Sequence, residues 1–393
     1  MSLSVLMPAD VRFPLERANG VQILKTAGAL ARAGIHTTLM VRHSDPRRTD
    51  EIMALYGIAP DPNLLIRRLP VLHRTGSFAL PRAAFLARTA AAIAAARGSL
   101  VFTRDLQLAD LLTGLGPLIA PVVYEAHAVE TLLYNERGAL YGTGERPNPR
   151  KARRLLKREG RVWRRAAGFV TTTAGIRATF EETYGPRANV AVVPNGCDVP
   201  AERSFPPLPE GTPRVVYAGQ LYPWKGVDVL VEAVAEIPEA RLVILGGLEL
   251  EDDLHRIRAL VARLGLNERV ELPGTVPQAQ VAAELEQASV VAVPFLKGAM
   301  TERHTSPIKL FEALAAGRPI VATDLPSTRE VLADSQDALL VPAGDATALA
   351  AAIRRLIEDR ELAERLARAA FDKAPEYSWD ARAARIKALL EAL

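Results

Sequence analysis

The chain has 393 residues, of which 49% are hydrophobic and 24% are charged. This composition is typical of a globular protein and argues against a disordered chain, and the length suits two domains of about 150 to 200 residues each. The single cysteine, Cys197, excludes an intramolecular disulfide framework and cysteine-rich zinc sites, which fits a reducing cytoplasm. The start of the chain carries neither a basic leader nor a long apolar run, so we expect no signal peptide and no membrane span.

The formal net charge is only +4, but positive charge is concentrated between Arg150 and Arg165, where nine residues are Lys or Arg and one, Glu159, is acidic. Apolar residues interleave with these cations: Leu155, Leu156, Val162 and Trp163. A helix here would have an apolar stripe flanked by cations, which could touch an anionic membrane surface. A helix packed on its own domain with solvated arginines is an equally good interpretation. Nucleic acid is a weaker candidate, because no nucleic-acid-binding motif accompanies the cluster.

Short β-branched runs alternate with alanine-rich helical segments, which is typical of parallel sheets covered by helices on both faces. In the first half of the chain this pattern predicts strands at residues 3–7, 36–42, 99–103, 121–126, 168–173 and 190–194. Between the first two strands, Asn19 can cap a helix that runs to about Ala33 and is ended by Gly34. A proline-rich break at 199–213 follows, and we interpret it as an interdomain linker.

The alternation restarts in the second half, with predicted strands at 214–219, 240–247, 269–274, 289–295, 319–323 and 338–344. The last segment, 377–393, is predicted to be a helix that packs back on the first domain. We therefore expect an α/β protein with an N-terminal domain at 1–198 and a C-terminal domain at 214–376. Two Rossmann-like domains in tandem would place a cleft between the carboxyl ends of both sheets.

The strongest functional signal lies after residue 303. Ser306 suits an N-cap, Pro307 the first helical position and Gly317 a left-handed end, which together predict a helix at 307–316. Lys309 falls in the first turn, where a cation opposes the helix dipole, so its position favours a bound phosphate or similar anion. Glu312 follows about one turn later. An ordinary surface helix with a stray lysine is the less favoured interpretation.

A second anion-facing element is the loop at 219–226, where Lys225 precedes Gly226 at the expected start of a helix. A lysine there can neutralise phosphate at the carboxyl end of the sheet. The backbone of PGTVP, at 273–277, could pair with the edge of a base. In the first domain His127 follows a predicted strand and would face the cleft, although a lone histidine is more often structural.

Several motifs are absent from the sequence. The loop before Gly20 is not the GxGxxG fingerprint of dinucleotide dehydrogenases, and there is neither a GxSxG elbow nor a P-loop. No Asp-x-Asp motif is present either, so a carboxylate clamp for a catalytic metal is not expected. Lysine and helix dipoles would then have to stabilise a leaving diphosphate.

With these motifs in this order, the chain resembles the retaining GT-B glycosyltransferases of family four over nearly its whole length. The matching segments are residues 19–42, YEAH at 124–127, VPNGCD at 193–198, YAGQLYPWKG at 217–226, PGTVP at 273–277 and SPIKLFEALAAGRPIVAT at 306–323. The resemblance implies two Rossmann-like domains that face each other across a central cleft. It also implies transfer of a sugar from a nucleotide diphosphate sugar, with retention of anomeric configuration and without an essential metal.

The resemblance further implies roles for particular residues. Lys225 would contact the diphosphate, Glu312 would hold the ribose and Val276 would meet the base through its main chain. His127 and Lys225 would serve catalysis. The remaining donor-side positions would be Gly20, Gln220, His304, Thr305, Ser306, Pro307, Ile308, Lys309 and Leu310. The acceptor side would include Asn19, Arg104, Glu125 and His127.

Two departures from the family pattern matter. His304 stands eight positions before Glu312, where the family usually has a glutamate, which affects recognition of the sugar hydroxyls. Gln220 stands where the family often has an arginine, which removes one charge from the expected phosphate clamp. Donor binding should therefore depend more heavily on Lys225 and on the helix after Ser306.

The sequence thus predicts a cytoplasmic retaining glycosyltransferase that uses a UDP- or GDP-sugar and a glycan, lipid-linked or small-molecule acceptor. Such an enzyme would serve polysaccharide, glycolipid or small-glycoside synthesis. Two alternatives stay open: a sugar-nucleotide epimerase of related architecture, and a nucleotide-sugar-binding protein without turnover. A further hypothesis is that the helix at 150–165, together with residues 78–88, docks the protein peripherally on the inner face of a membrane.

Overall fold

The computed structural model describes residues 3–12, 18–42, 47–70, 79–96, 98–116, 120–247 and 252–393. The chain divides into two compact units, and each contains one parallel sheet. The first unit comprises Met1–Leu132, Asn148–Asn195 and Trp379–Leu393, and the second comprises Leu133–Pro147 and Gly196–Ser378. The first unit therefore includes the last helix of the chain, and a short segment from the first half of the chain belongs to the second unit.

The sheet of the first unit has seven strands in the order β3-β2-β1-β4-β5-β6-β7, all parallel. The strands are β1 (Ser4–Arg12), β2 (His36–Arg42), β3 (Leu64–Leu69), β4 (Leu100–Thr103), β5 (Val122–Ala126), β6 (Gly168–Thr171) and β7 (Val190–Val192). Parallel strands place all their carboxyl ends at one edge of the sheet, where ligands bind in folds of this kind.

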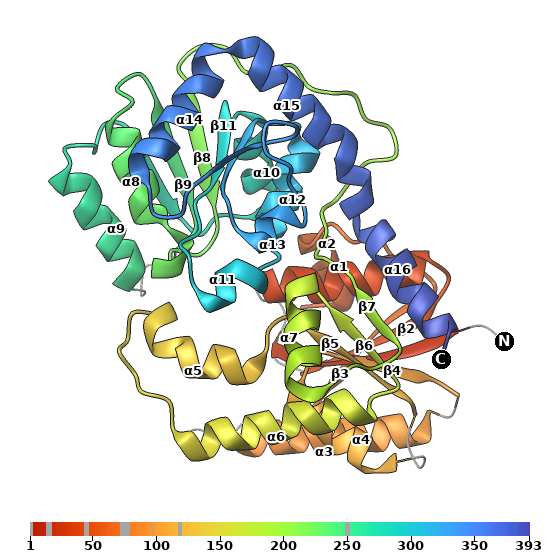
Figure 1. Ribbon diagram of the computed structural model, residues 1–393. Coiled ribbons are helices and arrows are strands. Elements are labelled where there is room, and N and C mark those ends of the chain that lie inside the picture. The colour runs from red at the N-terminus through yellow and green to blue at the C-terminus, as the bar shows by residue number, and fades with distance from the viewer. Residues whose placement is uncertain are drawn as a thin grey trace. The chain divides into compact units, whose positions relative to one another are not determined.

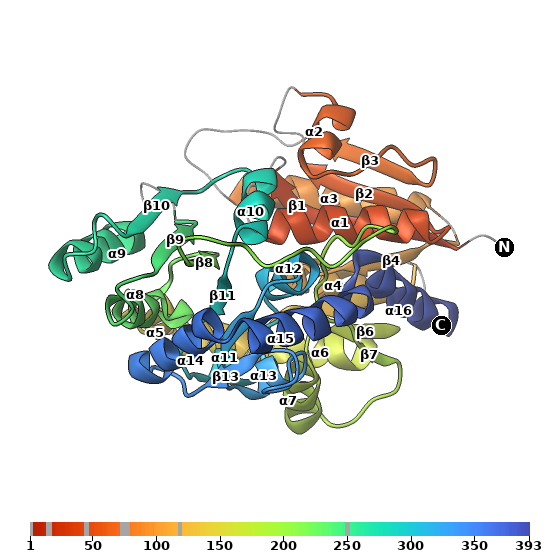
Figure 2. The same cartoon turned by 90° about the horizontal axis from the view of Figure 1, so that it is seen from above.

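Helices cover both faces of this sheet (Figures 1 and 2). Two of them, α1 (Ala18–Arg32) and α16 (Trp379–Glu391), pack together on one face. The other helices that lie within the unit are α2 (Thr49–Leu55), α3 (Ala79–Ala95), α4 (Leu106–Gly114), α6 (Pro149–Arg165) and α7 (Ala174–Tyr184). Trp163 of α6 is almost fully buried, its ring centroid 4.7 Å from that of Phe169 and 5.3 Å from that of Phe180. These aromatic contacts anchor α6 and α7 to the sheet.

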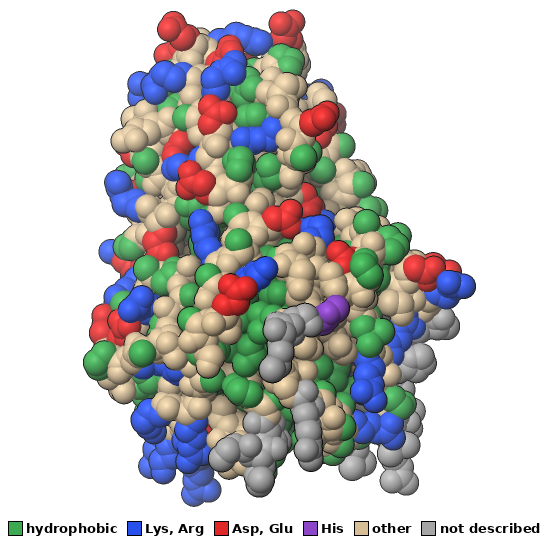
Figure 3. Space-filling view, turned by 90° about the vertical axis from the view of Figure 1, so that its right-hand side faces the viewer, with side chains coloured by type: hydrophobic (Ala, Val, Ile, Leu, Met, Phe, Trp, Pro, Cys, Tyr) green, Lys and Arg blue, Asp and Glu red, His purple; other side chains and the backbone are tan. Residues whose placement is uncertain are grey.

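The outer side of α6 is strongly basic. Two of its arginines, Arg158 and Arg161, form ion pairs with Asp110 of α4, and seven other cations are exposed: Arg150, Lys151, Arg153, Arg154, Lys157, Arg164 and Arg165. Three exposed leucines accompany these cations: Leu156 of α6, Leu111 of α4, and Leu115, which is the C-cap of α4. We call this region the α4–α6 surface. In Figure 3, a group of Lys and Arg side chains lies at the lower left of the view.

The second unit holds a six-stranded parallel sheet in the order β10-β9-β8-β11-β12-β13. Its strands are β8 (Arg214–Ala218), β9 (Arg241–Leu245), β10 (Val270–Gly274), β11 (Val290–Val293), β12 (Ile320–Thr323) and β13 (Leu339–Val341). Its longer helices are α8 (Val227–Ala235), α9 (Asp252–Arg263), α10 (Gln278–Glu286), α12 (Ile308–Ala316), α14 (Ala346–Glu358) and α15 (Arg360–Lys373). Shorter turns are η2 (Pro223–Lys225), α11 (Ala299–Arg303), α13 (Pro326–Arg329) and η3 (Ala374–Tyr377). Helix α5 (Glu130–Leu140) begins in the first unit and continues in the second.

Two apolar clusters sandwich this second sheet. Side chains of α8, α9 and α14 build the core on one face, and side chains of α10 and α12 build the core on the other. The alternation of β-branched runs with alanine-rich segments thus corresponds to strands that are buried on both faces. Among the described residues, no helix combines the length and the apolar character needed to cross a membrane.

The structure differs from the sequence-based expectation at several elements. Strand β3 was not expected, because Arg67 and Arg68 interrupt its apolar run; it is an edge strand with alternating exposure. Strand β1 continues to Arg12 through a register shift after Pro8, beyond the expected end at residue 7. Along the sequence, the boundary between the units falls between Asn195 and Gly196, whereas the expected first domain ended at 198, and residues 133–147 belong to the second unit.

Candidate functional site

The loop after β8 is held by tight backbone packing. Gly219 donates its N–H to the carbonyl of Leu245, 2.8 Å away, and the turn η2 then leads to Gly226. Gly226 has a φ of 69°, and a Cβ at this position would overlap the carbonyl oxygen of Pro294, so only glycine fits. This fit fixes the backbone directly after Lys225.

The side chain of Lys225 holds its amino group against two aromatic rings. Its Nζ lies 3.9 Å from the ring centroid of Trp224 and 4.5 Å from that of Phe295. Among the described residues no carboxylate forms an ion pair with it. Burial lowers the pKa of Lys225 to about 7, because a desolvated ammonium is disfavoured. An anion at this position would restore the charged form.

Two more polar groups of the same loop are unsatisfied. The side-chain oxygen Oε1 of Gln220 and the indole Nε1 of Trp224 are buried without a hydrogen-bond partner in the described part of the chain. Buried polar atoms are rarely left unpaired, so such a concentration is evidence for a bound molecule that supplies the partners. The loop therefore offers an amide oxygen, an indole N–H and an ammonium to a ligand.

Hydrogen bonds connect this loop to the segment before α12. The N–H of Leu296 donates to the carbonyl of Trp224 at 2.9 Å, and the hydroxyl of Thr301 donates to the carbonyl of Leu296 at 2.5 Å. The hydroxyl of Ser327 in turn donates to the carbonyl of Thr301 at 2.6 Å. The structure thus brings together, at the carboxyl ends of β8 and β11, two segments that are far apart in the sequence.

The N-terminus of α12 differs from the expected one. The helix begins at Ile308, and its N-cap is Pro307, whose ψ of 124° is extended, so Pro307 is not the first helical residue and Ser306 is not the cap. The short helix α11 lies just before it and has its C-cap at His304, so residues 305–307 form a non-helical connection between the two helices. The N–H of Leu310 donates to the carbonyl of Pro307 at 3.1 Å. The N–H groups before it, those of Ile308 and Lys309, precede the first intrahelical bond and can meet a ligand. Gly317, with a φ of 61°, ends the helix as expected.

Lys309 and Glu312 form a cluster with a residue that was not expected, Gln278. The Nζ of Lys309 lies 2.7 Å from Oε2 of Glu312 and 3.2 Å from Oε1 of Gln278. The Nε2 of Gln278 donates to Oε1 of Glu312 at 2.7 Å. A side chain of α12 therefore accounts for the position of Lys309 without any anion, which weakens the inference drawn from the sequence. Each oxygen of Glu312 still keeps acceptor capacity for a hydroxyl group.

The other expected donor-side residues lie around this cluster. Val276 is half-buried in the turn between β10 and α10, next to Thr275, whose hydroxyl donates to the carbonyl of Gly247. His304 is buried, and the hydroxyl of Thr305 donates to the carbonyl of Met300 at 3.1 Å. The side chains of Ile308 and Leu310 are buried in the core of the second unit, so only their backbone is available to a ligand.

In the first unit a buried polar network surrounds Glu125 at the carboxyl end of β5. The Nε2 of Gln22 donates to both carboxylate oxygens, at 3.2 and 3.3 Å, and Oε2 lies 3.0 Å from Nε2 of His127. Arg104, just after β4, donates from Nη1 to Oε1 of Gln22 at 2.8 Å. The buried Arg382 of α16 forms an ion pair with Oε1 of Glu125. Gln22 and Arg382 were not expected from the sequence.

The charge state of this network follows from its partners. Burial alone would raise the pKa of Glu125, but Arg382 and His127 beside it hold that pKa well below its usual range. Burial, with the nearby cation of Arg104, lowers the pKa of His127 to about 4 despite the Glu125 carboxylate. His127 is therefore a neutral imidazole at pH 7, next to an ionised carboxylate.

Asn19 and Gly20 do not play their expected local roles. Helix α1 begins at Ala18, so Asn19 lies inside its first turn and is not the N-cap. The Oδ1 atom of Asn19 is buried and lacks a hydrogen-bond partner in the described part of the chain, which leaves it available to a ligand. Gly20 is buried in the same turn.

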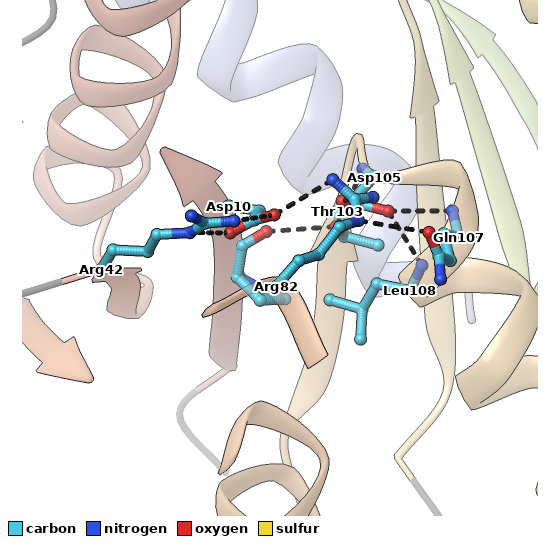
Figure 4. Close-up of polar contacts among 8 residues, drawn as sticks. Asp10, Arg42, Arg82, Thr103, Asp105, Gln107 and Leu108 are labelled. Carbon is cyan, nitrogen blue, oxygen red and sulfur yellow. Dashed lines mark hydrogen bonds and ion pairs between the residues drawn. The ribbon is translucent and has the colours of Figure 1, made fainter. Parts of the chain in front are cut away.

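A second ion-pair network holds the same edge of this sheet (Figure 4). Asp10, near the end of β1, pairs with Arg42 at the end of β2 and with Arg82 of α3, whose Nη1 lies 3.0 Å from Oδ2. Arg82 also donates to Asp105 at 2.9 Å, and Asp105 caps α4. Two cations and two carboxylates cancel in charge here. This network ties β1, β2, α3 and α4 together and offers no net charge to a ligand.

Comparison with known protein families covers both units. Residues 198–373 match the family model described as glycosyl transferases group 1, and residues 19–196 match the model described as glycosyl transferase 4-like domain. The two models together account for nearly the whole chain, in the order expected for the GT-B glycosyltransferases. These matches do not favour the epimerase or the non-catalytic binding protein.

Curated relatives give similarities over part of the chain. A phosphatidyl-myo-inositol mannosyltransferase of Mycobacterium leprae is 35% identical over 208 residues, which cover 51% of this chain and 52% of the relative. A D-inositol 3-phosphate glycosyltransferase of Xylanimonas cellulosilytica is 29% identical over 287 residues, covering 67% and 64%. The chain thus spans about half the length of the first of these relatives and somewhat less than two thirds of the second.

Solved structures extend the likeness to the whole chain. A sucrose-phosphate synthase from Thermosynechococcus elongatus superimposes with a TM-score of 0.78 at 21% identity, covering 99% of this chain and 98% of that one. Anabaena Alr3699/HepE, in complex with UDP and glucose, gives a TM-score of 0.75 at 17% identity over the full length of both chains. This likeness confirms the expected α/β fold of two Rossmann-like domains.

Proposed function

Because the chain belongs to the group 1 glycosyltransferases, we propose that it transfers a sugar from a nucleotide diphosphate sugar to an acceptor, with retention of configuration. The observation that carries this proposal is the unpaired cation of Lys225, which lies beside two unsatisfied polar groups of the same loop. A diphosphate would supply the missing counter-charge and hydrogen-bond partners.

On this proposal the second unit binds the donor. Lys225 and the first N–H groups of α12 hold the diphosphate and stabilise the negative charge that develops as it leaves, so no metal ion is needed. Glu312 accepts hydrogen bonds from the ribose hydroxyls, and the main chain at Val276 meets the base. A UDP- or GDP-sugar would fit these roles.

The proposed chemistry keeps the anomeric configuration. The acceptor oxygen attacks the anomeric carbon on the face from which the diphosphate departs, and a phosphate oxygen of the leaving group takes the acceptor proton. His127, as a neutral imidazole, binds a hydroxyl of the transferred sugar. Asn19, Arg104 and Glu125 belong to the acceptor side of the proposed site.

A first test is thermal stabilisation by UDP, GDP, ADP and their common sugar conjugates, with and without EDTA. A ligand at about 100 times its dissociation constant adds about 2.7 kcal/mol to the stability of the folded state. We expect one nucleotide family to raise the Tm in the presence of EDTA, and Lys225→Ala to lose most of the increase. If no nucleotide changes the Tm of the wild type, the proposed donor site is wrong.

The second test is transfer itself. The donor found in the first test is incubated with a panel of acceptors that includes inositol, inositol phosphate and phosphatidylinositol, because two relatives are named for acceptors of this class. An acceptor-dependent glycoside that retains the anomeric configuration of the donor supports the proposal. Conversion of the donor to its epimer without an acceptor would favour the epimerase instead, and binding without turnover would favour a binding protein.

We further propose that the α4–α6 surface docks on an anionic membrane. Its seven exposed cations lie beside three exposed leucines, a combination that favours contact with acidic headgroups and the upper part of the acyl chains. Of the second segment predicted to help, residues 79–88 belong to α3, and Phe78 lies outside the described residues. A peripheral site on the inner face of the membrane would give access to a lipid-linked acceptor.

Vesicle flotation tests this surface. We expect binding to vesicles that contain phosphatidylserine or phosphatidylinositol at low salt, weaker binding at high salt, and none to neutral phosphatidylcholine vesicles. The double variant Arg153→Glu/Arg154→Glu should lose binding. The matched control Arg241→Glu/Arg355→Glu makes the same charge change at two exposed positions of the second unit and should keep it. Equal loss in both variants would contradict a specific surface.

A further inference from the structure

Arg382 is a deeply buried cation of the first unit. It lies on α16, 257 residues after Glu125 in the sequence, and only 1% of the residue is exposed. Buried arginines are rare unless their donors are satisfied. The hydrogen-bond partners of the Arg382 guanidinium therefore indicate why it is buried.

Its guanidinium reaches three different parts of the unit. Nε donates to the hydroxyl of Thr26 in α1 at 3.2 Å, and Nη1 donates to the carbonyls of Val193, at 2.7 Å, and Pro194, just after β7. Nη2 donates to Oε1 of Glu125 at the end of β5. A planar fork with fixed N–H directions can serve four acceptors at once, whereas a lysine has three donors on one nitrogen.

The other carboxylate oxygen of Glu125 defines the tautomer of His127. Nε2 of His127 lies 3.0 Å from Oε2, although this contact does not have the geometry of a full hydrogen bond. An ionised carboxylate is an acceptor only, so the contact favours a ring proton on Nε2. The neutral ring then has a bare Nδ1. That atom has no hydrogen-bond partner among the described residues, and 18% of the His127 side chain is exposed. Nδ1 is thus an acceptor that is available to a ligand.

We propose that Arg382 is a positioning residue for sugar transfer: by fixing the Glu125 carboxylate it holds His127 as the Nε2–H tautomer, whose Nδ1 accepts a hydrogen bond from a donor-sugar hydroxyl. This inference rests on the proposed function. The last helix of the chain thereby acts on a residue of the candidate site without touching the substrate.

The remaining charged groups nearby are consistent with this arrangement. Arg104 faces the network from the end of β4 and, like Arg382, disfavours a second proton on His127. Glu130, at the start of α5, interacts with Arg104 and Asp105, and burial raises its pKa. Without the cation of Arg382, the buried Glu125 would take up a proton more readily, and its O–H could then donate a hydrogen bond to a bare Nε2. Nδ1 would then carry the ring proton and could no longer accept a hydrogen bond.

The test combines nitrogen-15 NMR of the histidine side chains with kinetics. The signals of His127 are assigned by their loss in His127→Gln. We expect the wild type to show the Nε2–H tautomer at pH 7, whatever the enzyme's activity. We expect Arg382→Met to shift His127 toward the Nδ1–H tautomer and to lower kcat/KM about tenfold, the loss of one hydrogen bond. Arg382→Lys, which keeps the charge, should restore the tautomer and part of the activity.

Arg32→Gln is the matched control. It removes an exposed ion pair between α1 and Asp380 of α16, and neither partner of this pair contacts Glu125. The tautomer of His127 and the kcat/KM of transfer should therefore stay unchanged. An Nδ1–H tautomer in the wild type would overturn the inference, even if Arg382→Met does not fold. Wild-type tautomer and kcat/KM in a folded Arg382→Met would also overturn it. Absence of any transfer by the wild type would instead reject the proposed function, because the NMR result does not depend on turnover.

Discussion

Replacing Lys225 with methionine should stabilise the ligand-free protein and at the same time weaken nucleotide binding. Methionine keeps an unbranched stem that can pack on Trp224 and Phe295, but it removes an ammonium that has no carboxylate partner among the described residues. The ammonium is costly because burial lowers the pKa of Lys225 from 10.5 to about 7. We expect opposite signs for the two effects, because the proposed diphosphate would supply the negative charge that Lys225 lacks among the described residues of the free protein.

The size of the stabilisation follows from this pKa difference. The unfolded chain binds the lysine proton more tightly by 10.5 − 7, or about 3.5 pKa units, which at 1.36 kcal/mol per unit sets a ceiling of about 5 kcal/mol below pH 7. The side chain is only half-buried, and the lost cation–π attraction is worth about 0.5 to 2 kcal/mol. We therefore expect a net gain of about 1 to 3 kcal/mol.

The pH dependence has a defined sign. Between pH 7 and 10.5 the unfolded chain carries more of the lysine proton than the folded protein does, so the wild type gains stability as the pH rises through this range. The advantage of Lys225→Met should accordingly be largest at pH 6 and smaller at pH 9.5. Calorimetry at both pH values, with and without UDP or GDP, measures both effects.

Lys297→Met is the control for this experiment. Lys297 belongs to the same region but is 71% exposed and pairs with Glu302 at 3.3 Å, so its loss should change neither the Tm nor nucleotide binding measurably. A lower Tm for Lys225→Met at pH 6 would refute the reasoning, because it would show that the ammonium of Lys225 stabilises the ligand-free fold.

Three further predictions concern stability. Burial raises the pKa of Glu159 from its ordinary 4.5 to about 7, so between these pH values the folded protein binds a proton that the unfolded chain has lost. The stability of the folded protein should therefore fall as the pH rises from about 4.5 to about 7. Glu159→Gln should remove this fall when the Tm is measured at pH 5 and 7.5, and an unchanged difference in Tm would contradict the assignment. Trp163→Ala should cost about 3 to 5 kcal/mol in urea unfolding, because it empties a fully packed aromatic site, and a loss below 1 kcal/mol would show that the cluster does not anchor α6. Gly226→Ala should lower the free energy of unfolding by at least about 1 kcal/mol, because a Cβ would overlap the carbonyl of Pro294. It should also reduce the Tm increase given by UDP or GDP. Unchanged nucleotide binding would mean that the loop does not position Lys225.

The sequence predicted the elements that repeat a simple pattern. Of the thirteen strands in the described part of the chain, twelve were expected, because strands buried on both faces appear as short runs of β-branched residues. The exception, Leu64–Leu69, is an edge strand that buries one side only, so arginines interrupt its apolar run. Side-chain preferences also misplaced the cap of α12, where the preceding short helix determines the backbone.

The candidate site was predictable only where its residues lie within continuous motifs. Lys225, Glu312 and His127 each occupy a recognisable local pattern. Gln278 could have been noticed, because it directly follows PGTVP, but its contact with Glu312 depends on the fold. Arg382 carries no local signal, since the residue that gives it a role is 257 positions earlier. A single sequence does not encode such a pairing in any spacing or periodicity.

The position of α16 has a consequence for biosynthesis. The first unit combines residues 1–132 and 148–195 with residues 379–393, so it cannot be completed on the ribosome until α16 has emerged. Until then Glu125 would be a carboxylate without its arginine, exposed to solvent or buried at a high cost. A fragment that ends at Asn195 should therefore be a poor autonomous domain, and attaching residues 379–393 to it through a linker should restore its folding. Residues 379–393 thus supply a structural part that the first unit lacks until they have been translated.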